Sequence, residues 1–176
     1  LVGNRTLAKI ISIANQKGGV GKTTTSVNLA SSLHAYKQRV LLVDIDPQGN
    51  ATMGSGVDKQ SCQLSVYNVL TEKNSIEEVV VTTEAGGYDL LPANRDLVAA
   101  EVELMQEIGR ETRLRHALNR IASNYDFIII DCPPSLNMMT VNALVASDGV
   151  IIPMQCEYYA LEGLSDLNNT IRQIAK

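Results

Sequence analysis

The sequence has no long apolar run, few cysteines and little aromatic character. No stretch approaches the roughly 20 consecutive apolar residues that span a bilayer, so we expect no membrane segment. The three cysteines, Cys62, Cys132 and Cys156, are odd in number and widely spaced, which favours reduced thiols in the cytoplasm over a disulfide framework. One Phe and no Trp stand beside six Tyr, so the core must be built from Ile, Leu, Val and Ala.

An excess of basic charge is missing as well. The net charge is −4, whereas a DNA-binding surface usually shows a basic imbalance. The nearest candidate is a set of arginines on or beside a helix expected at 111–123, namely Arg110, Arg113, Arg115 and Arg120. We interpret them as a solvated face with salt bridges to Glu107 and Glu111. A DNA-binding surface would therefore lie beyond Lys176 or be assembled by dimerisation.

What the sequence does have is a glycine-rich loop. An apolar run, Ile10-Ile11-Ser12-Ile13-Ala14, comes shortly before Lys17-Gly18-Gly19-Val20-Gly21-Lys22-Thr23-Thr24, and a helical pattern follows. Strand, loop and helix in this order are the context of a phosphate-binding loop. The glycines let backbone N–H groups point at one anion, and the helix N-terminus adds the positive end of its dipole. Lys22 would bring a point charge to the outer phosphates, and the Thr23 hydroxyl would ligate Mg²⁺.

The front of this loop departs from the usual pattern G-x-x-x-x-G-K-[ST]. The position that should hold the first glycine is Gln16, and a second lysine, Lys17, follows it. An isolated lysine in a loop is usually solvated. Within Lys-Gly-Gly-Val-Gly-Lys-Thr-Thr we expect Lys17 to act on phosphate instead.

Acidic residues follow two further predicted strands. Asp44-Ile45-Asp46-Pro47-Gln48-Gly49-Asn50-Ala51-Thr52 comes after the apolar residues 40–43, and Asp131 ends the isoleucine run of Phe127-Ile128-Ile129-Ile130-Asp131-Cys132-Pro133-Pro134-Ser135. Asp131 has the position of a Walker B acid, which binds Mg²⁺ directly or through water. Asp44 and Asp46 would share a face if their strand continued regularly. Turn or cap roles are the alternatives for Asp46 and Asp131.

Together with Ile152-Pro153-Met154-Gln155-Cys156-Glu157-Tyr158-Tyr159-Ala160-Leu161-Glu162-Gly163, these segments resemble the deviant Walker A ATPases of the ParA/MinD superfamily, and within it the ParA (Soj) group of partition ATPases. The resemblance implies that Lys17 acts across an ATP-bound dimer on the partner's phosphates. It implies that Asp46 positions or activates the attacking water, and that Asp44 supports Mg²⁺ or the switch loop. Gly18 is then a close-approach glycine between two facing loops, with a backbone position of φ > 0 as the alternative.

The resemblance also implies a complete site and its function. The nucleotide-binding residues are Lys17, Gly18, Gly19, Val20, Gly21, Lys22, Thr23 and Thr24, with Lys17, Lys22 and Asp46 in catalysis and Thr23, Asp46 and Asp131 at the metal. ATP or ADP and Mg²⁺ are the implied cofactors. An ATP-dependent homodimer would bind non-specific DNA and be reset by slow hydrolysis, stimulated by a ParB-type centromere-binding protein. Its place would be the cytoplasm and nucleoid of a prokaryote, and residues 131–135 would sense the γ-phosphate.

Three other functions stay open at this point. A small-molecule enzyme, such as a dethiobiotin synthetase-like ligase, would use the same loop, although no second substrate pocket is evident. A MinD-like ATPase would cycle on membranes and need a C-terminal amphipathic helix. A chain that binds nucleotide without turning it over is the non-enzymatic alternative. The segment Asp-Pro-Gln-Gly-Asn-Ala-Thr favours partition.

Apolar, β-branched-rich runs alternate with helical patterns along the chain. The predicted strands are 9–14, 39–44, 88–91, 126–131 and 148–153, and the predicted helices are 22–36, 64–71, 75–80, 95–107, 111–123, 137–146 and 161–175. This order predicts a three-layer α/β/α P-loop NTPase domain with a mostly parallel central sheet. Ligands bind such sheets at the carboxyl ends of the strands, which gathers the loop, Asp46 and Asp131 at one edge.

The domain boundaries follow from the same patterns. Residues 1–8 are expected as a flexible tail and 9–176 as one ATPase domain, truncated at its C-terminal end because the last helical pattern has no stop signal. Residues 52–63 are polar and glycine-rich, which predicts a flexible loop. In the helix at 111–123, Leu114, Leu118 and Ile121 should form one buried face.

Overall fold

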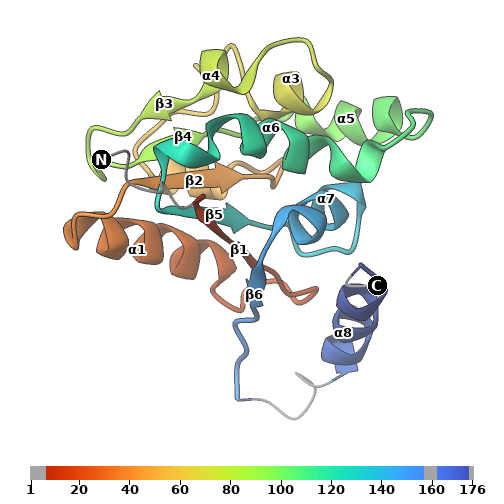
Figure 1. The fold of residues 1–176 in the computed structure, drawn as a ribbon. Coiled ribbons are helices and arrows are strands. Elements are labelled where there is room, and N and C mark those ends of the chain that lie inside the picture. The colour runs from red at the N-terminus through yellow and green to blue at the C-terminus, as the bar shows by residue number, and fades with distance from the viewer. Residues whose placement is uncertain (1–6, 157–161, 175–176) are drawn as a thin grey trace, which may run out of the picture.

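A computed structural model describes residues 7–156 and 162–174. Within these residues the centre of the molecule is a six-stranded sheet in the order β3-β4-β2-β5-β1-β6 (Figure 1). The strands are β1 (Lys9–Ile13), β2 (Val40–Asp44), β3 (Val81–Thr82), β4 (Asp89–Leu91), β5 (Phe127–Asp131) and β6 (Gly149–Ile151). The described neighbours are parallel, with β3 antiparallel to β4, so the prediction of a mostly parallel sheet is confirmed.

Helices cover both faces of the sheet (Figure 1). α1 (Lys22–Ala35) lies on one face with α2 (Asn50–Gly54) beside it. The opposite face carries α3 (Val66–Leu70), α4 (Ile76–Val79), α5 (Leu97–Leu104), α6 (Arg113–Ile121) and α7 (Met138–Ala146), with 3-10 turns at Arg110–Thr112 and Ala122–Asn124. α8 (Glu162–Ile174) contacts α7. This is the predicted three-layer α/β/α arrangement.

Successive residues of β2 belong to two different cores. Leu41 and Val43 pack with the helices on the α6 side, whereas Val40 and Leu42 pack with residues on the α1 side. Neighbouring side chains of a strand point to opposite faces of the sheet. A strand covered on both faces must therefore be apolar at every position, which explains the unbroken apolar runs in the sequence.

Helix α6 buries the face that its spacing predicts. Leu114 and Leu118 are fully buried, and Ile121 is nearly so. The α-helical part is shorter than the predicted 111–123, because a 3-10 turn precedes it and another follows it. The apolar stripe closes the core over the sheet, as an amphipathic helix of a three-layer domain should.

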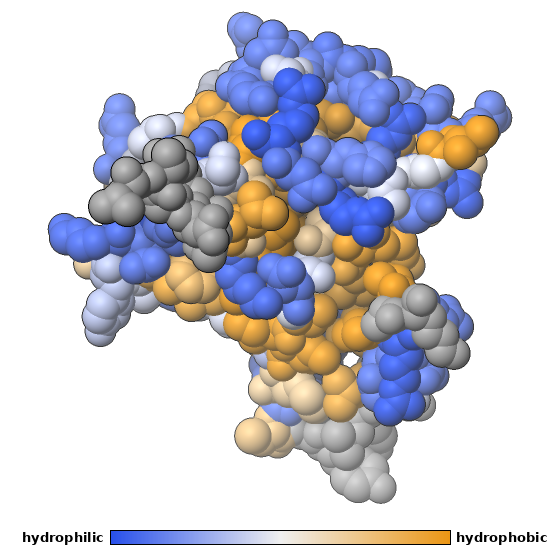
Figure 2. Space-filling view, in the orientation of Figure 1, coloured by the Kyte–Doolittle hydropathy of each residue, from blue (hydrophilic) through white to orange (hydrophobic). Residues whose placement is uncertain are grey.

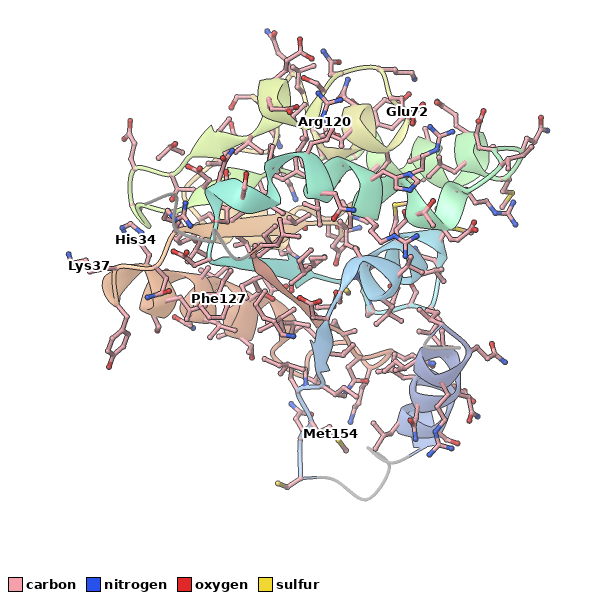
Figure 3. The ribbon with its side chains drawn as sticks, in the orientation of Figure 1. His34, Lys37, Glu72, Arg120, Phe127 and Met154 are labelled. Atoms are coloured by element: carbon pink, nitrogen blue, oxygen red, sulfur yellow. The ribbon has the colours of Figure 1, made fainter. Side chains whose placement is uncertain are left out.

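Two of the arginines near α6, Arg113 and Arg120, are ion-paired on the outer side of the molecule. Arg113 contacts Glu72 and lies 3.0 Å from Glu107, while Nε of Arg120 lies 3.3 Å from Oε1 of Glu77. Figure 3 labels Arg120 and Glu72 on this side. The predicted salt bridge to Glu107 is confirmed for Arg113. No ion pair to Glu111 occurs among the residues described, and Glu72 and Glu77 are partners that the sequence did not indicate.

Two elements were not predicted. α2 falls inside the segment expected as a flexible loop, and Thr52 and Ser55 are buried there, so that prediction is wrong for residues 52–55. β3 has two residues and adds to the sheet at its β4 edge. Neither element is long enough to show a hydrophobic period. β3 pairs with β4, which follows it closely in the chain, whereas α2 also depends on a contact with Ala93.

Some predicted segments lie partly outside the described residues. Of the tail expected at 1–8, residues 1–6 are not described, and Ala8 is buried with its N–H bonded to Ala122 O at 3.1 Å. The packed domain therefore starts one residue before the predicted boundary at 9. In the last motif, residues 157–161 lie outside the described part. None of the helices described is long and apolar enough to cross a membrane.

The surface differs between two regions of the molecule. Figure 2 shows hydrophilic colour over the α3–α6 side and apolar colour around β6 and α7. Ile151 and Met154 are 39% and 40% exposed in that apolar region, and Figure 3 labels Met154 there. The β6 edge is thus the apolar margin of the domain as described.

Candidate functional site

The glycine-rich loop joins the end of β1 to the start of α1, as predicted. Gly19 and Gly21 have φ values of 72° and 88°, in the left-handed region that favours glycine. Gly21 is the N-cap of α1, and its carbonyl accepts the N–H of Thr25 at 2.9 Å. The N-cap makes no side-chain hydrogen bond to the helix. The first amide groups of α1 are therefore available to an anion, with the helix dipole favouring negative charge.

An open pocket of about 420 Å³ lies over this loop. Its lining residues are Gly18, Gly19, Gly21, Lys22, Thr23, Thr24, Asp46, Asn50 and Pro134. The structure thus brings the phosphate loop and Asp46 together at the carboxyl edge of the sheet. Sequence reasoning did not select Asn50 or Pro134 individually, although both stand inside the quoted segments that follow β2 and β5.

Lys22 is folded back over the loop. Its ammonium donates to the backbone carbonyl of Lys17 at 2.8 Å, and the residue is 7% exposed. Burial lowers the pKa of Lys22, and the carboxylates of Asp131 and Asp46 oppose that shift. A phosphate oxygen could replace the carbonyl as acceptor without moving the helix. The backbone N–H of Lys17 donates to Asn15 Oδ1 at 3.0 Å, and the role of its side chain across a dimer stays a prediction.

Asp131, at the end of β5, accepts hydrogen bonds from hydroxyl groups of α1. Thr23 Oγ1 donates to Asp131 Oδ2 at 2.8 Å, and Ser26 Oγ donates to Oδ1 at 2.7 Å. Burial raises the pKa of Asp131 to about 6, against the effect of these hydrogen bonds. The structure therefore brings together two of the three predicted metal ligands. Ser26 was missed, although its position three residues after Thr23 places both on one helix face.

These side chains fit Mg²⁺. Thr23 and Asp131 offer hard oxygen donors within 2.8 Å of each other, which is the ligand type that Mg²⁺ takes. No group of three or more His, Cys, Asp or Glu side chains that could hold a metal occurs among the residues described. The protein would thus supply few ligands, and phosphate and water would complete an octahedral shell.

Asp44 and Asp46 have different surroundings because β2 ends at Asp44. The N–H of Asp46 donates to Asp44 Oδ1 at 3.1 Å, so the chain turns and the two side chains do not continue one strand face. Asp46 is 8% exposed and lines the pocket, and its Oδ1 accepts the N–H of Gln48 at 2.9 Å. Asp44 is fully buried, and its contacts are with Thr52 and the Asp46 backbone. Burial and the nearby Asp131 raise the pKa of Asp44 to about 7.

Residues 8–176 match a protein family described as AAA domain. The chain is 65% identical over 169 residues to an uncharacterized protein of Pseudomonas putida, covering 96% of this chain and 64% of that protein. It is 55% identical over 170 residues to the sporulation initiation inhibitor protein Soj of Bacillus subtilis, covering 97% and 67%. It is 54% identical over 166 residues to the chromosome partitioning protein ParA of Myxococcus xanthus, covering 94% and 59%. The chain thus spans about two thirds or less of these relatives.

A solved structure shares both the fold and much of the sequence. Cobyrinic acid a,c-diamide synthase from Mycobacterium smegmatis, with bound ATP analog and magnesium, matches with a TM-score of 0.92 and 42% identity. The match covers 96% of this chain and 68% of that chain. The likeness confirms the predicted fold class.

Proposed function

This chain belongs to the Soj/ParA family of P-loop ATPases, and we propose that it carries the ATP-driven switch of a chromosome or plasmid partition system. In this proposal two copies close around two ATP molecules, the dimer binds non-specific DNA, and hydrolysis returns the monomers. A ParB-type centromere-binding protein stimulates the hydrolysis. The relatives named Soj and ParA support the biological role, and the geometry of the phosphate loop supports the dimer.

Gly18 is the observation that carries the dimer proposal. Gly18 is exposed, its φ lies outside the left-handed region, and a Cβ built on it meets nothing within 4 Å. The fold of a single chain therefore gives no reason for glycine at this position. A surface that approaches the loop closely from outside would give one, as two facing loops in a dimer do. Gly19 differs, because its φ of 72° accounts for glycine without a partner.

Different pocket residues would bind different parts of the Mg²⁺–nucleotide complex. The loop amides and the N-terminus of α1 would hold the phosphates, and Lys22 would exchange the Lys17 carbonyl for a phosphate oxygen. Thr23 and Asp131 would hold Mg²⁺, which when bound neutralises charge on the outer phosphates. Asp46 lines the same pocket as the phosphate loop, and there it would orient an attacking water.

Hydrolysis in this proposal depends on the partner subunit. Phosphoryl transfer to water needs positioning and neutralisation of charge more than covalent help from the protein. A positive group delivered from a second chain raises such rates by roughly 10³ or more. Lys17, placed at the front of the loop beside Gly18, would be that group. Without the dimer the rate stays low, which suits a timer.

One alternative has support of its own, and a second stays open. The likeness to a cobyrinic acid a,c-diamide synthase favours a small-molecule enzyme with the same phosphate loop. A MinD-like membrane cycle would use the same switch with a membrane-binding helix. The segment Asp46-Pro47-Gln48-Gly49-Asn50 and the relatives named ParA favour partition over both.

The test is the solution mass of the Asp46→Ala variant of the full-length protein, measured by light scattering in ATP and in ADP. We expect a dimer in ATP and a monomer in ADP, because binding is kept while hydrolysis stalls. Lys22→Ala is the control that should remain monomeric in both. Adding Gly18→Ala to the Asp46→Ala background should give a monomer that still binds ATP.

Two outcomes would contradict parts of this proposal. A monomer of Asp46→Ala in both nucleotides would contradict the sandwich dimer and make the small-molecule enzyme the leading function. Wild-type hydrolysis by Asp46→Ala would show that this residue does not act on the attacking water.

A further inference from the structure

The carboxylate of Asp44 ties together both ends of the segment that carries Asp46. Asp44 Oδ1 accepts the N–H of Asp46 at 3.1 Å. Asp44 Oδ2 accepts both the N–H and the hydroxyl of Thr52, each at 2.8 Å. Asp44 and Thr52 are both fully buried. One side chain at the end of β2 thus fixes the backbone at the start of the segment and inside helix α2.

The hydroxyl of Thr52 extends this network to the end of a second strand, β4. Thr52 Oγ1 accepts the N–H of Ala93 at 3.0 Å, two residues after the end of β4. The hydroxyl therefore uses its one hydrogen toward Asp44 and a lone pair toward Ala93. Rotation of the Thr52 side chain about its Cα–Cβ bond would leave the N–H of Ala93 without this acceptor. The ends of β2 and β4 and the helix α2 are joined at this one oxygen.

Asp46 begins the segment that these bonds hold. Its carbonyl accepts the N–H of Gly49 at 2.8 Å, and its Oδ1 accepts the N–H of Gln48 at 2.9 Å. The turn is therefore closed internally at Asp46 and anchored at both ends by Asp44. The orientation of the Asp46 side chain toward the pocket therefore depends on Asp44. This matters because a displacement of about one ångström in a catalytic group lowers the reaction rate by a large factor.

We infer that Asp44 and Thr52 are positioning residues, which act by holding Asp46 in place over the pocket. Neither is among the residues that line the pocket over the phosphate loop. This inference rests on the proposed hydrolysis and revises the expectation that Asp44 supports Mg²⁺. The carboxylate of Asp44 accepts two backbone amides, that of Asp46 at the start of the turn and that of Thr52 inside α2, and both would have to be displaced to free these oxygens for a cation.

The experiment compares Thr52→Val with Thr52→Ser in the full-length protein. Valine keeps the shape of threonine and removes the hydroxyl, whereas serine keeps the hydroxyl. We expect Thr52→Val to lower kcat for ATP hydrolysis about tenfold or more, with the affinity for a non-hydrolysable ATP analog within twofold of wild type. Thr52→Ser should leave both quantities within twofold, because its hydroxyl can make the same two bonds.

A matched control is Thr83→Val. Thr83 is also buried, and its hydroxyl donates to Tyr88 O at 2.8 Å in the turn between β3 and β4, outside the pocket. This variant should keep kcat within twofold. Equal loss of kcat in Thr83→Val and Thr52→Val would mean a general loosening of the fold and would overturn the inference. So would wild-type kcat in a folded Thr52→Val.

A second measurement covers the case in which Thr52→Val does not fold. Hydrogen exchange of wild-type protein should show the amides of Asp46 and Thr52 as protected as those of β2, with and without the ATP analog. Exchange as fast as that of exposed turns would overturn the inference. A wild-type protein that does not hydrolyse ATP would overturn the proposed function itself, and this inference with it.

Discussion

The ends of β2 and β5 carry the same residue type at the same height in the sheet, in different surroundings. Asp44 and Asp131 are register partners on neighbouring strands, and both are fully buried. The donors to Asp131 are the hydroxyls of Thr23 and Ser26 on α1. The donors to Asp44 include two backbone amides, from Asp46 and Thr52.

The difference lies in what the donors can do. A hydroxyl can rotate, so the donors of Asp131 can turn away and let a cation approach the carboxylate. A backbone amide is fixed by the chain on both sides and cannot. Two acids that look alike in the sequence are therefore suited to opposite purposes, one to a metal that comes and goes and the other to a permanent connection.

The largest break in this comparison should come from Asp131→Ala. We expect loss of Mg²⁺-dependent hydrolysis by roughly a thousandfold, about 4 kcal/mol of barrier, because the carboxylate ligand is removed. Nucleotide affinity without Mg²⁺ should change far less, since the loop amides and Lys22 remain. Hydrolysis rates over a Mg²⁺ titration check this. An unchanged Mg²⁺ dependence would mean that Asp131 is not the metal ligand.

On the β2 side, where backbone amides hold Asp44, the largest effect on stability should come from Gly49→Ala. Gly49 caps α2 with a φ of 62°, and an added Cβ would lie 2.8 Å from Lys59 Cδ and 3.0 Å from Ala93 O. We expect the free energy of unfolding to fall by about 2–3 kcal/mol in urea denaturation. Gly18→Ala is the matched control and should change it by less than about 1 kcal/mol. Equal losses in the free energy of unfolding for Gly49→Ala and Gly18→Ala would contradict the conclusion that the turn at Gly49 is tightly packed and the loop at Gly18 is open.

On the β5 side, Mg²⁺ binding by Asp131 should depend on pH. Burial raises the pKa of Asp131 to about 6, and Mg²⁺ binding needs the ionised carboxylate. The apparent Mg²⁺ affinity, measured by calorimetry, should therefore fall toward tenfold per pH unit below about 6 and level off above 7. Asp131→Asn should remove most of this dependence.

The raised pKa of Asp131 affects the stability of the metal-free protein in the opposite direction: stability falls with rising pH, whereas Mg²⁺ affinity rises. A carboxyl whose pKa is raised from 3.8 to about 6 on folding contributes stability that is full below about pH 4 and is lost as the pH rises through 6. Denaturation curves without Mg²⁺ should show this decline. Stability that instead rose between pH 4 and 7 would mean that other groups dominate.

The smallest effect should come from Ser26→Ala. It removes one of the two hydroxyls on Asp131 and leaves the carboxylate and Thr23 in place. A net hydrogen bond of about 1 kcal/mol corresponds to a change of roughly fivefold in Mg²⁺ affinity. Ser55→Ala, which removes a buried hydroxyl on the Tyr88 side, is the control that should leave Mg²⁺ affinity unchanged. No difference between the two variants would mean that Ser26 does not orient Asp131.

The sequence predicts the parts of this molecule that are local in the chain. The alternation of strands and helices, the glycine loop, and the acids at the ends of β2 and β5 each appear within about ten residues, and the fold keeps them where the pattern places them. Thr52 and α2 could not be predicted, because the position of the helix also depends on the bond from Thr52 to the amide of Ala93, 41 residues later. The residues that tune the site come from such distant contacts.

The contact between Gln155 and the phosphate loop makes the neighbouring residue, Cys156, a suitable site for a fluorescent label. Gln155 Nε2 donates to the carbonyl of Gly19 at 3.2 Å, so the segment after β6 touches the loop on which nucleotide would bind. The next residue, Cys156, is exposed, whereas Cys132 is buried and Cys62 is partly buried. Burial raises the pKa of both other thiols, which lowers their reactivity toward alkylating dyes. A fluorophore on Cys156 would then report in real time when the loop closes on a phosphate.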